Sequence, residues 1–194
     1  VSLTVTTAHG CTDTLNRTIN VKQGPKVDFT YSPACINTPV YFTNKTNVAF
    51  GLATNYTWTR DTTKFSSQKS PTSTFSDTGS YIITLTVNQI ANNCTSSVSK
   101  GINISPKPRP AIIASDICEG QATTLSGINN EPKSKPSAWI WNIDTLPTEN
   151  GTLINHQFAT TGKHKAVLTI VDSVGCTESF DTTINVHSTP VASF

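Results

Sequence analysis

The stretch Phe75-Ser-Asp-Thr-Gly-Ser-Tyr-Ile-Ile-Thr-Leu-Thr-Val87 decides the fold class of this chain. After a polar turn around Gly79, apolar side chains occupy every second position up to Val87, which is the period of a strand with one buried face. The stretch has a counterpart further along, Phe158-Ala-Thr-Thr-Gly-Lys-His-Lys-Ala-Val-Leu-Thr-Ile170. Other short runs alternate in the same way and no window has a convincing helical period, so the sequence predicts an all-β protein.

A second repeated segment begins with cysteine and occurs three times. It reads Cys11-Thr-Asp-Thr-Leu-Asn-Arg-Thr-Ile-Asn-Val21, then Cys94-Thr-Ser-Ser-Val-Ser-Lys-Gly-Ile-Asn-Ile104, then Cys176-Thr-Glu-Ser-Phe-Asp-Thr-Thr-Ile-Asn-Val186. Isolated residues recur with the same spacing of about 83 positions: Pro25 and Pro108, Cys35 and Cys118, Trp58 and Trp141, Phe75 and Phe158, Gly79 and Gly162. Matches at one spacing along the whole chain indicate an array of similar modules.

The spacing divides the chain into parts. We expect the last strands of a truncated module in residues 1–24, whole modules in 25–107 and 108–189, and the first strand of a further module in 190–194. A module of ~80 residues with about seven short strands predicts an antiparallel, immunoglobulin-like β-sandwich. Residue 1 is expected to lie within a strand, so the chain is expected to start inside a longer protein. The short proline-containing junctions predict modules placed end to end with limited freedom.

Composition excludes several functional classes. The 194 residues include 33 threonines and 20 serines, and only 13% of the residues are charged. The 14 basic residues are scattered singly, which argues against a nucleic acid partner. No apolar run approaches the ~20 residues that a membrane span needs.

No residues suggest catalysis. The four histidines and five cysteines form no Cys-x-x-Cys or His-x-x-x-His ligand spacing, and no phosphate loop or Gly-x-Ser-x-Gly segment occurs. The residues that recur are Trp, Gly, Pro, Phe and Cys, which are scaffold types. The sequence therefore predicts a protein that is not an enzyme, with no catalytic residue, no metal site and no cofactor. The histidines, His9, His156, His164 and His187, are expected to be surface residues that are solvated or locally hydrogen-bonded.

The strand around Trp58, the Phe75–Val87 segment and the closing cysteine segment together resemble PKD domains, which are immunoglobulin-like modules found in tandem on cell surfaces. The cysteine-bearing version resembles repeats in large surface proteins of gliding and gut Bacteroidota, including their giant gliding adhesins. One departure lies in the Trp-x-Phe-Gly-Asp-Gly hairpin of the family. It reads Trp58-Thr-Arg-Asp-Thr-Thr63 and Trp141-Asn-Ile-Asp-Thr-Leu146 here, without either turn glycine.

Aromatic residues are assigned mainly to the core. Trp58 and Trp141 are expected to fill the space between sheets, together with Phe75 and Phe158. Tyr81 resembles a tyrosine corner that hydrogen-bonds to the backbone. Trp139 shares a strand face with Trp141, and two such rings do not easily share one core position. If Trp139 is exposed, it is the one candidate for stacking on a ligand, but core or interdomain packing is the favoured expectation.

The cysteines predict disulfides and an oxidising compartment. Two pairings remain open: Cys35 with Cys94 and Cys118 with Cys176 within modules, or Cys35 with Cys176 between modules. Cys35 and Cys94 are expected at opposite ends of one sandwich, separated by a strand of ~17–20 Å, whereas a disulfide needs Cα atoms within ~7 Å. This favours the bond between modules, which would leave Cys11, Cys94 and Cys118 with partners outside the chain.

Five of the eight aspartates precede Ser or Thr and then an apolar residue or Thr. This pattern resembles the O-glycosylation acceptor of Bacteroidota. The resemblance implies acceptors at Thr14, Thr62, Thr145, Ser173 and Thr182. The other interpretation is ordinary turn chemistry in a threonine-rich chain.

The expected function is that of a non-enzymatic stalk or filament segment of a large extracellular adhesin on a bacterial surface, in which gliding attachment follows from the resemblance alone. Its partners would be neighbouring repeats of the same chain and a polysaccharide or a solid surface. The alternative is a spacer or carbohydrate-binding module of a secreted polysaccharide-degrading enzyme. An exposed Trp139 beside a groove would favour the alternative.

Overall fold

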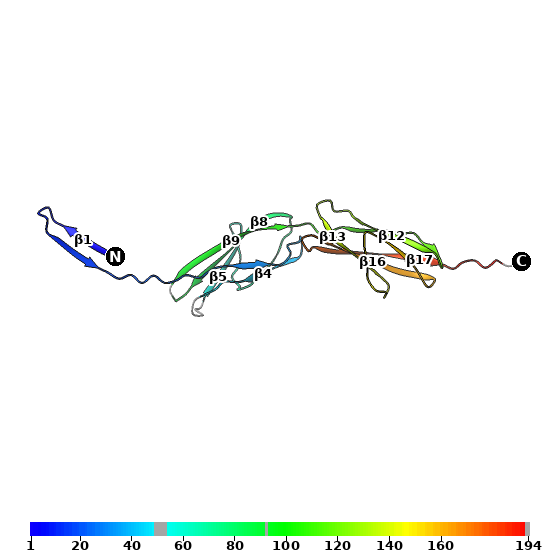
Figure 1. Ribbon diagram of the computed structural model, residues 1–194, viewed down its shortest axis with the longest axis horizontal. Coiled ribbons are helices and arrows are strands. Elements are labelled where there is room, and N and C mark those ends of the chain that lie inside the picture. Colours follow the sequence, from blue (N-terminus) through cyan, green and yellow to red (C-terminus); the bar gives the residue numbers. More distant parts are fainter. Residues whose placement is uncertain (49–53, 92, 193–194) are drawn as a thin grey trace.

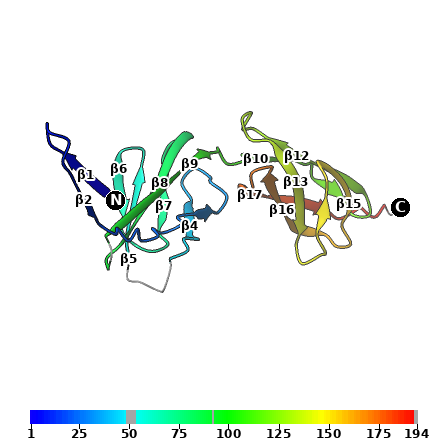
Figure 2. The same cartoon turned by 60° about the vertical axis from the view of Figure 1, so that its left-hand side comes forward.

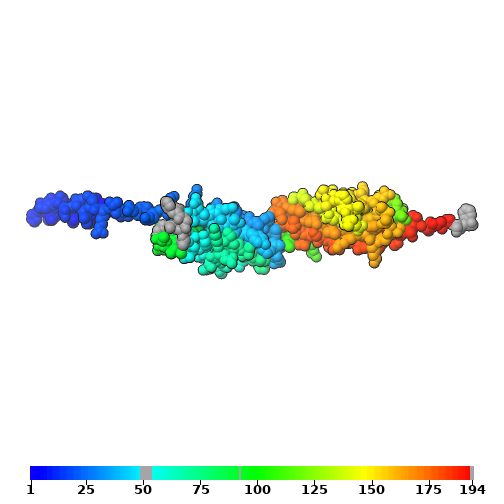
Figure 3. All heavy atoms as spheres, turned by 90° about the horizontal axis from the view of Figure 1, so that it is seen from below, coloured from blue at the N-terminus to red at the C-terminus, as the bar shows by residue number. Residues whose placement is uncertain are grey.

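The protein is an elongated array of β-structure, seen in a computed structural model that describes residues 1–48, 54–91 and 93–192. A β-hairpin lies at one end and is followed by two sandwiches placed end to end, with the two termini at opposite ends of the molecule (Figure 1). The space-filling view shows the same line of bodies joined at a narrow waist (Figure 3). Within the described residues no helix is present, and hence none that is long and apolar enough to cross a membrane.

Seven strands of the first sandwich lie within the described residues. They are β3 (Phe29–Tyr31), β4 (Pro39–Asn44), β5 (Thr54–Arg60), β6 (Thr63–Ser66), β7 (Thr72–Thr74), β8 (Gly79–Gln89) and β9 (Cys94–Ile104). One sheet has the order β3-β4-β7 and the other the order β6-β5-β8-β9. The long β8 and β9 pair in one register along their whole length, and their inward residues alternate with less buried ones, as the period-two pattern predicts.

The second sandwich repeats this arrangement (Figure 2). Its strands are β10 (Pro110–Ile113), β11 (Ile117–Cys118), β12 (Ala122–Asn129), β13 (Pro136–Ile143), β14 (Glu149–Asn150), β15 (Leu153–Gln157), β16 (Gly162–Asp172) and β17 (Thr177–His187). The sheets have the orders β10-β12-β15 and β11-β17-β16-β13-β14. The immunoglobulin-like β-sandwich predicted from sequence is therefore confirmed. One detail differs from a purely antiparallel fold, because the two-residue β11 pairs with β17 in parallel.

Each sandwich has its own core around a tryptophan. Trp58 and Trp141 are both fully buried, and Phe75 and Phe158 are buried beside them. The indole N–H groups do not remain unpaired, because Trp58 donates to the carbonyl oxygen of Gln68 at 2.9 Å and Trp141 donates to a backbone carbonyl at 2.8 Å. The predicted core residues thus lie between the sheets with their polar atoms satisfied.

The two end segments carry less structure than the whole sandwiches. Residues 1–24 contain the hairpin β1 (Ser2–Thr6) and β2 (Thr12–Asn16), and its residues are exposed. The strand β2 is shorter than β9 and β17. Its partner β1 begins at Ser2, which lies opposite Asn16, so the pairing ends there. A first strand of a further module is expected at 190–194. Residues 190–192 do not form a strand, since no described strand pairs with them. Residues 193 and 194 lie outside the described residues.

Candidate functional site

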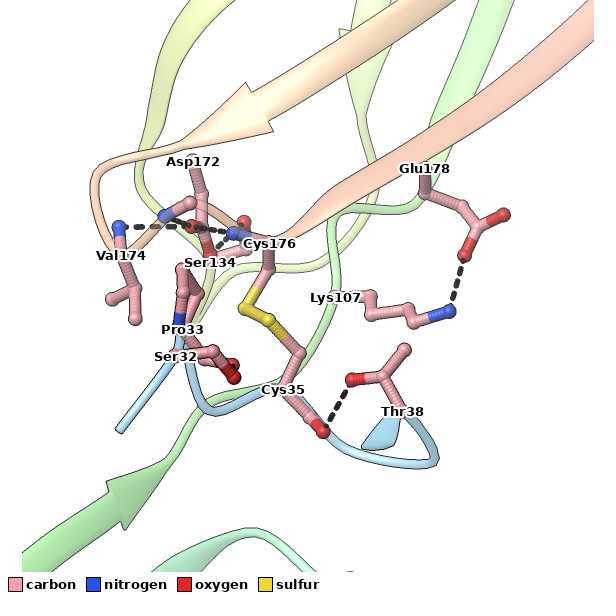
Figure 4. The surroundings of a disulfide bond; sticks show 11 residues. Ser32, Pro33, Cys35, Thr38, Lys107, Ser134, Asp172, Val174, Cys176 and Glu178 are labelled. Carbon is pink, nitrogen blue, oxygen red and sulfur yellow. Dashed lines mark hydrogen bonds and ion pairs between the residues drawn. A yellow bond between two sulfur atoms is a disulfide. The ribbon is translucent and has the colours of Figure 1, made fainter. Parts of the chain in front are cut away.

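The feature that stands apart from the two cores is the junction between the sandwiches, which carries a disulfide bond. Cys35 of the first sandwich is bonded to Cys176 of the second, with the Cα atoms 5.7 Å apart and 141 positions between them in sequence (Figure 4). Cys35 lies in the loop between β3 and β4, and Cys176 lies in the turn between β16 and β17. The bond therefore joins the far end of one sandwich to the near end of the next.

The loop of Cys35 is fixed to the last residue before the linker. Cys35 forms a parallel bridge with Ser105, the amide of Ser105 donates to the carbonyl oxygen of Ala34 at 2.9 Å, and the amide of Ile36 donates to Ser105 at 2.9 Å. Two residues after the cysteine, Asn37 has a left-handed backbone with φ of 55°, which short polar residues tolerate. These bonds place the Cys35 sulfur at the end of the sandwich where the chain leaves it.

The turn of Cys176 is held by one buried carboxylate. Oδ1 of Asp172 accepts the amide hydrogens of Val174, Gly175 and Cys176 at 2.9, 3.0 and 2.8 Å. Gly175 has a φ of 96°, a conformation that strains residues with a Cβ atom, so glycine suits the position immediately before the cysteine. Asp172 and Cys176 are both almost fully buried.

Direct packing surrounds the bond. The ring of Pro33 approaches Gly175 so closely that a Cβ atom there would lie 3.1 Å from Pro33 Cγ. A shallow groove of about 450 Å³ runs beside the bond, lined by residues 31–34 and by Val174. Lys107 in the linker pairs with Glu178 of β17, with Nζ 3.2 Å from Oε2. Linker, disulfide and packing together hold the sandwiches at three places (Figure 4).

The arrangement gives the junction two covalent connections in place of one. The peptide chain leaves β9 at Ile104 and enters β10 at Pro110, and the disulfide runs beside this linker. A single short linker permits bending and twisting about itself, whereas a second connection at another point removes most of these rotations. The bond is a covalent cross-link between the two sandwiches at a point away from the peptide linker.

The favoured cysteine pairing is present and the alternative is absent. Because Cys35 and Cys176 are bonded to each other, neither of the within-module bonds to Cys94 or Cys118 is formed. Within the described residues, Cys11 and Cys118 are free thiols, the first exposed and the second half-buried. The positions of the cysteines at the ends of the strands, and not their spacing in the sequence, determine which sulfurs meet.

Trp139, the candidate for ligand stacking, does not form an exposed platform. Its side chain is half-buried and packs against the second core. It fits because the facing strand carries Gly127, where a Cβ atom would lie 2.9 Å from Trp139 Cε3 and 2.8 Å from Leu168 Cδ2. Core packing, the favoured expectation for Trp139, is the arrangement observed, and the small Gly127 is the reason that a second tryptophan is accommodated.

Tyr81 and its counterpart hold equivalent corners with different chemistry. The hydroxyl of Tyr81 donates to the carbonyl oxygen of Asp77 at 3.3 Å, as expected for a tyrosine corner. In the second sandwich, His164 Nε2 lies 2.8 Å from the carbonyl oxygen of Thr160, and its Nδ1 lies 2.7 Å from Oδ2 of Asp144. The imidazole thus replaces the phenol at this corner and adds an acidic partner.

The acidic partner changes the titration of the corner. The hydrogen bond with the Asp144 carboxylate raises the pKa of His164, although desolvation acts in the opposite direction. Desolvation also acts to raise the pKa of Asp144, but its hydrogen bonds with His164 and with the amide of Lys165 outweigh this effect and lower the pKa below 3.8. Sequence reasoning missed this pair because the register of β13 and β16 brings its members together.

The predicted glycan acceptors differ in accessibility. Thr14, Thr62, Thr145 and Ser173 are exposed, while Thr182 is half-buried on β17 opposite the buried Ala166. Thr62 and Thr145 directly follow aspartates with left-handed backbones, Asp61 with φ of 53° and Asp144 with φ of 48°. Among the described residues, no group of three or more His, Cys, Asp or Glu is placed to hold a metal ion.

Comparison with known proteins agrees with the topology of the second sandwich. Residues 103–187 match the PKD domain family. The matched range begins in β9 and ends at the last residue of β17, so it covers the whole PKD-like second sandwich and the linker before it.

Of the three solved structures described next, the first shares the fold of this chain. The fibronectin(III)-like modules of Clostridium thermocellum CbhA are 10% identical over 84% of this chain and 94% of theirs, with a TM-score of 0.52. The PKD1 domain of Vibrio anguillarum Epp is 13% identical over 44% of this chain and 99% of its own, with a TM-score of 0.40. The PKD1 domain of the Vibrio cholerae metalloprotease PrtV is 18% identical over 43% and 99%, with a TM-score of 0.36. No curated protein matches the chain.

Proposed function

We propose that the chain is a non-enzymatic segment of a stiff extracellular rod, the stalk or filament of a large repetitive adhesin on a bacterial outer surface. The observation that carries the proposal is the Cys35–Cys176 bond at the junction. Modules that contact mainly their neighbours form a quasi-one-dimensional object, whose stiffness depends on its junctions. A disulfide beside a short proline-containing linker supplies that stiffness.

The same bond protects the rod under tension. Force that enters near the N-terminus reaches Cys35 and can pass directly through the disulfide to Cys176. Residues 36–175, which include most of both sandwiches, then add no length to the molecule even if their strands separate. This behaviour suits a tether that must not lengthen when a cell moves or is pulled from a surface.

The extracellular location is supported by the chemistry of the disulfide, and the role in gliding by the resemblance of the repeats. Disulfides persist in oxidising surroundings outside the cytoplasm, which supports an extracellular location. Attachment during gliding of Bacteroidota is the specific form of the proposal and rests on the resemblance of the repeats. Neighbouring modules of the same chain are the direct partners, and a polysaccharide or a solid surface is the partner of the whole adhesin.

A carbohydrate-binding or spacer module of a secreted enzyme is the competing function. The ring nominated for stacking on a sugar, Trp139, is half-buried against the second core over Gly127, which favours the stalk.

The proposal is tested by combining shape and location. Small-angle X-ray scattering of the oxidised chain should give one extended distance distribution, and reduction or a Cys35→Ser, Cys176→Ser variant should broaden it. Antibodies against the chain should label intact cells of the native host. Labelling only after permeabilisation, or binding to polysaccharides that is lost in a Trp139→Ala variant, contradicts the proposal.

A further inference from the structure

Cys118 occupies in the second sandwich the place that Cys35 occupies in the first. It lies in β11, which pairs in parallel with the end of β17, just as Cys35 bridges Ser105 in parallel after β9. The amide of the next residue, Glu119, donates to the carbonyl oxygen of His187 at 2.8 Å, as Ile36 does to Ser105. Two residues after the cysteine, Gly120 has a left-handed φ of 79° where Asn37 has 55°.

The two loops differ in what covers them. Cys35 is 5% exposed because the turn of the second sandwich lies against it, whereas Cys118 is a half-buried free thiol. The second sandwich therefore presents the same loop as the first, with a half-buried free cysteine at the end where β17 finishes. The loop of Cys118 matches that of Cys35 in its parallel bridge, its backbone hydrogen bond and its left-handed residue, and the loop of Cys35 is one that forms a disulfide with the next module.

The complementary half is present at the other end of the chain. In the turn between β1 and β2, the amide of Thr7 donates to the carbonyl oxygen of Cys11. The amide of Gly10 donates to the carbonyl oxygen of Thr7, and both distances are 2.9 Å. The turn of Cys176 has the same two backbone hydrogen bonds. The amide of Asp172 donates to the carbonyl oxygen of Cys176 at 2.9 Å, and the amide of Gly175 donates to that of Asp172 at 3.0 Å.

The details of the two turns also agree. Gly10 has a φ of 83° immediately before Cys11, as Gly175 has 96° before Cys176. The Thr7 hydroxyl accepts the Cys11 amide at 3.2 Å, where Asp172 Oδ1 accepts that of Cys176. Cys11 is exposed, so this turn is a free copy of the part that docks at the junction.

We infer that the end of the second sandwich around Cys118 is a docking site for the cysteine-bearing turn of a further module of this kind, closed by a disulfide. The inference rests on the proposed rod and names the partner of its second junction. A low-molecular-weight disulfide supplies the oxidation. The Cys118 thiolate attacks it, releasing one thiol and forming a mixed disulfide, and the incoming cysteine thiolate then displaces the second thiol. Two protein thiols are oxidised and one small disulfide is reduced to two thiols.

The second bond would overlap the first along the chain. Cys118 lies within residues 36–175, the segment enclosed by the Cys35–Cys176 bond. With both bonds closed, each junction would be spanned by a peptide linker and a disulfide, so no junction would depend on the peptide linker alone.

The test uses two variants of the intact chain that each retain one half. A Cys11→Ser chain keeps Cys118, and a Cys118→Ser chain keeps Cys11. In a buffer of reduced and oxidised glutathione, neither should form chains of covalently linked copies alone, and an equimolar mixture should form a dimer that reduction abolishes. Peptide mapping should identify Cys118 linked to Cys11. A Cys94→Ser background in both variants leaves this result unchanged.

A longer chain removes the dependence on concentration. A second copy of residues 108–189 is placed directly after Thr189, which brings Cys118 opposite the Cys176 turn of the added copy. A peptide that links these two cysteines supports the inference. Cys118 that stays open to alkylation while Cys35–Cys176 is intact overturns it, as does a Cys118–Cys118 dimer in the mixture. Either result leaves the scattering test of the first junction, and so the proposed rod, unaffected.

Discussion

The imidazole of His164 stands in the second sandwich where the phenol of Tyr81 stands in the first. Both rings reach the backbone carbonyl four residues earlier, and both pack on a phenylalanine, Phe158 at 4.5 Å and Phe75 at 5.0 Å between ring centroids. The partners of His164, a carboxylate and a carbonyl oxygen, can only accept hydrogen bonds. Both contacts are therefore satisfied only when the ring is protonated on both nitrogens.

The first prediction is a pH dependence of the second sandwich. Because the folded pKa of His164 is raised, its stabilising contribution is fully present below the unfolded pKa of about 6.5 and is lost as pH rises through the folded pKa. The lowered pKa of Asp144 gives a contribution that is lost as pH falls through its folded value. Urea unfolding of the whole chain between pH 5 and 9 should show decreasing stability on the alkaline side.

A matched variant isolates the histidine. His164→Tyr restores the corner of the first sandwich and should remove the alkaline loss, whereas His9→Gln, which changes an exposed histidine of the hairpin, should not alter it. An unchanged alkaline loss in His164→Tyr contradicts the assignment.

The second prediction concerns the stability that the disulfide provides. A Cys35→Ser, Cys176→Ser variant opens a closed loop of 141 residues. Chain-entropy models assign about 5 kcal/mol to such a loop, and strain in the native state reduces that value. Thermal unfolding should occur at lower temperature than in the oxidised wild type. The reduced wild type is the control and should match the variant.

The third prediction is a difference in length under force. When the chain is pulled from its two ends, the oxidised protein should release only the residues outside the disulfide. The enclosed segment spans 141 positions, and at ~3.3–3.6 Å per residue it should add about 470–510 Å of contour length after reduction. Single-molecule force spectroscopy measures this directly. An equal contour length in both states would show that the bond does not bear the load.

The fourth prediction tests the accommodation of Trp139. Gly127→Ala places a Cβ atom 2.8 Å from Leu168 and 2.9 Å from Trp139, and overpacking of a core typically costs about 1–3 kcal/mol. Denaturant unfolding should detect this loss. Gly101→Ala is the control, since a Cβ atom there meets nothing within 4 Å. Equal stability of the two variants would indicate that the facing strand moves aside.

The fifth prediction concerns modification. If the protein from its native host is glycosylated, the glycans should lie on exposed Thr14, Thr62, Thr145 or Ser173, and half-buried Thr182 should be unmodified. Intact-mass measurement followed by peptide mapping locates them. A bare polypeptide mass rules out glycosylation, and glycans found only on other residues contradict the acceptor pattern.

Much of the fold follows from sequence because the information is local and repeated. The alternation from Tyr81 to Val87 determines which face of β8 is buried, and the recurrence of Trp58 as Trp141 identifies a second core of the same kind. A period of two residues is a property of any strand with one buried face, so it can be recognised without knowledge of the partners.

The sequence by itself determined the sandwich class, the core tryptophans and a choice between two cysteine pairings. Tertiary structure alone decided which pairing is present, that Trp139 lies over Gly127, and that His164 meets Asp144. The physical reason is that these contacts join residues distant in sequence or on different strands. Their meeting depends on strand register and on how two sandwiches abut, neither of which a local pattern encodes.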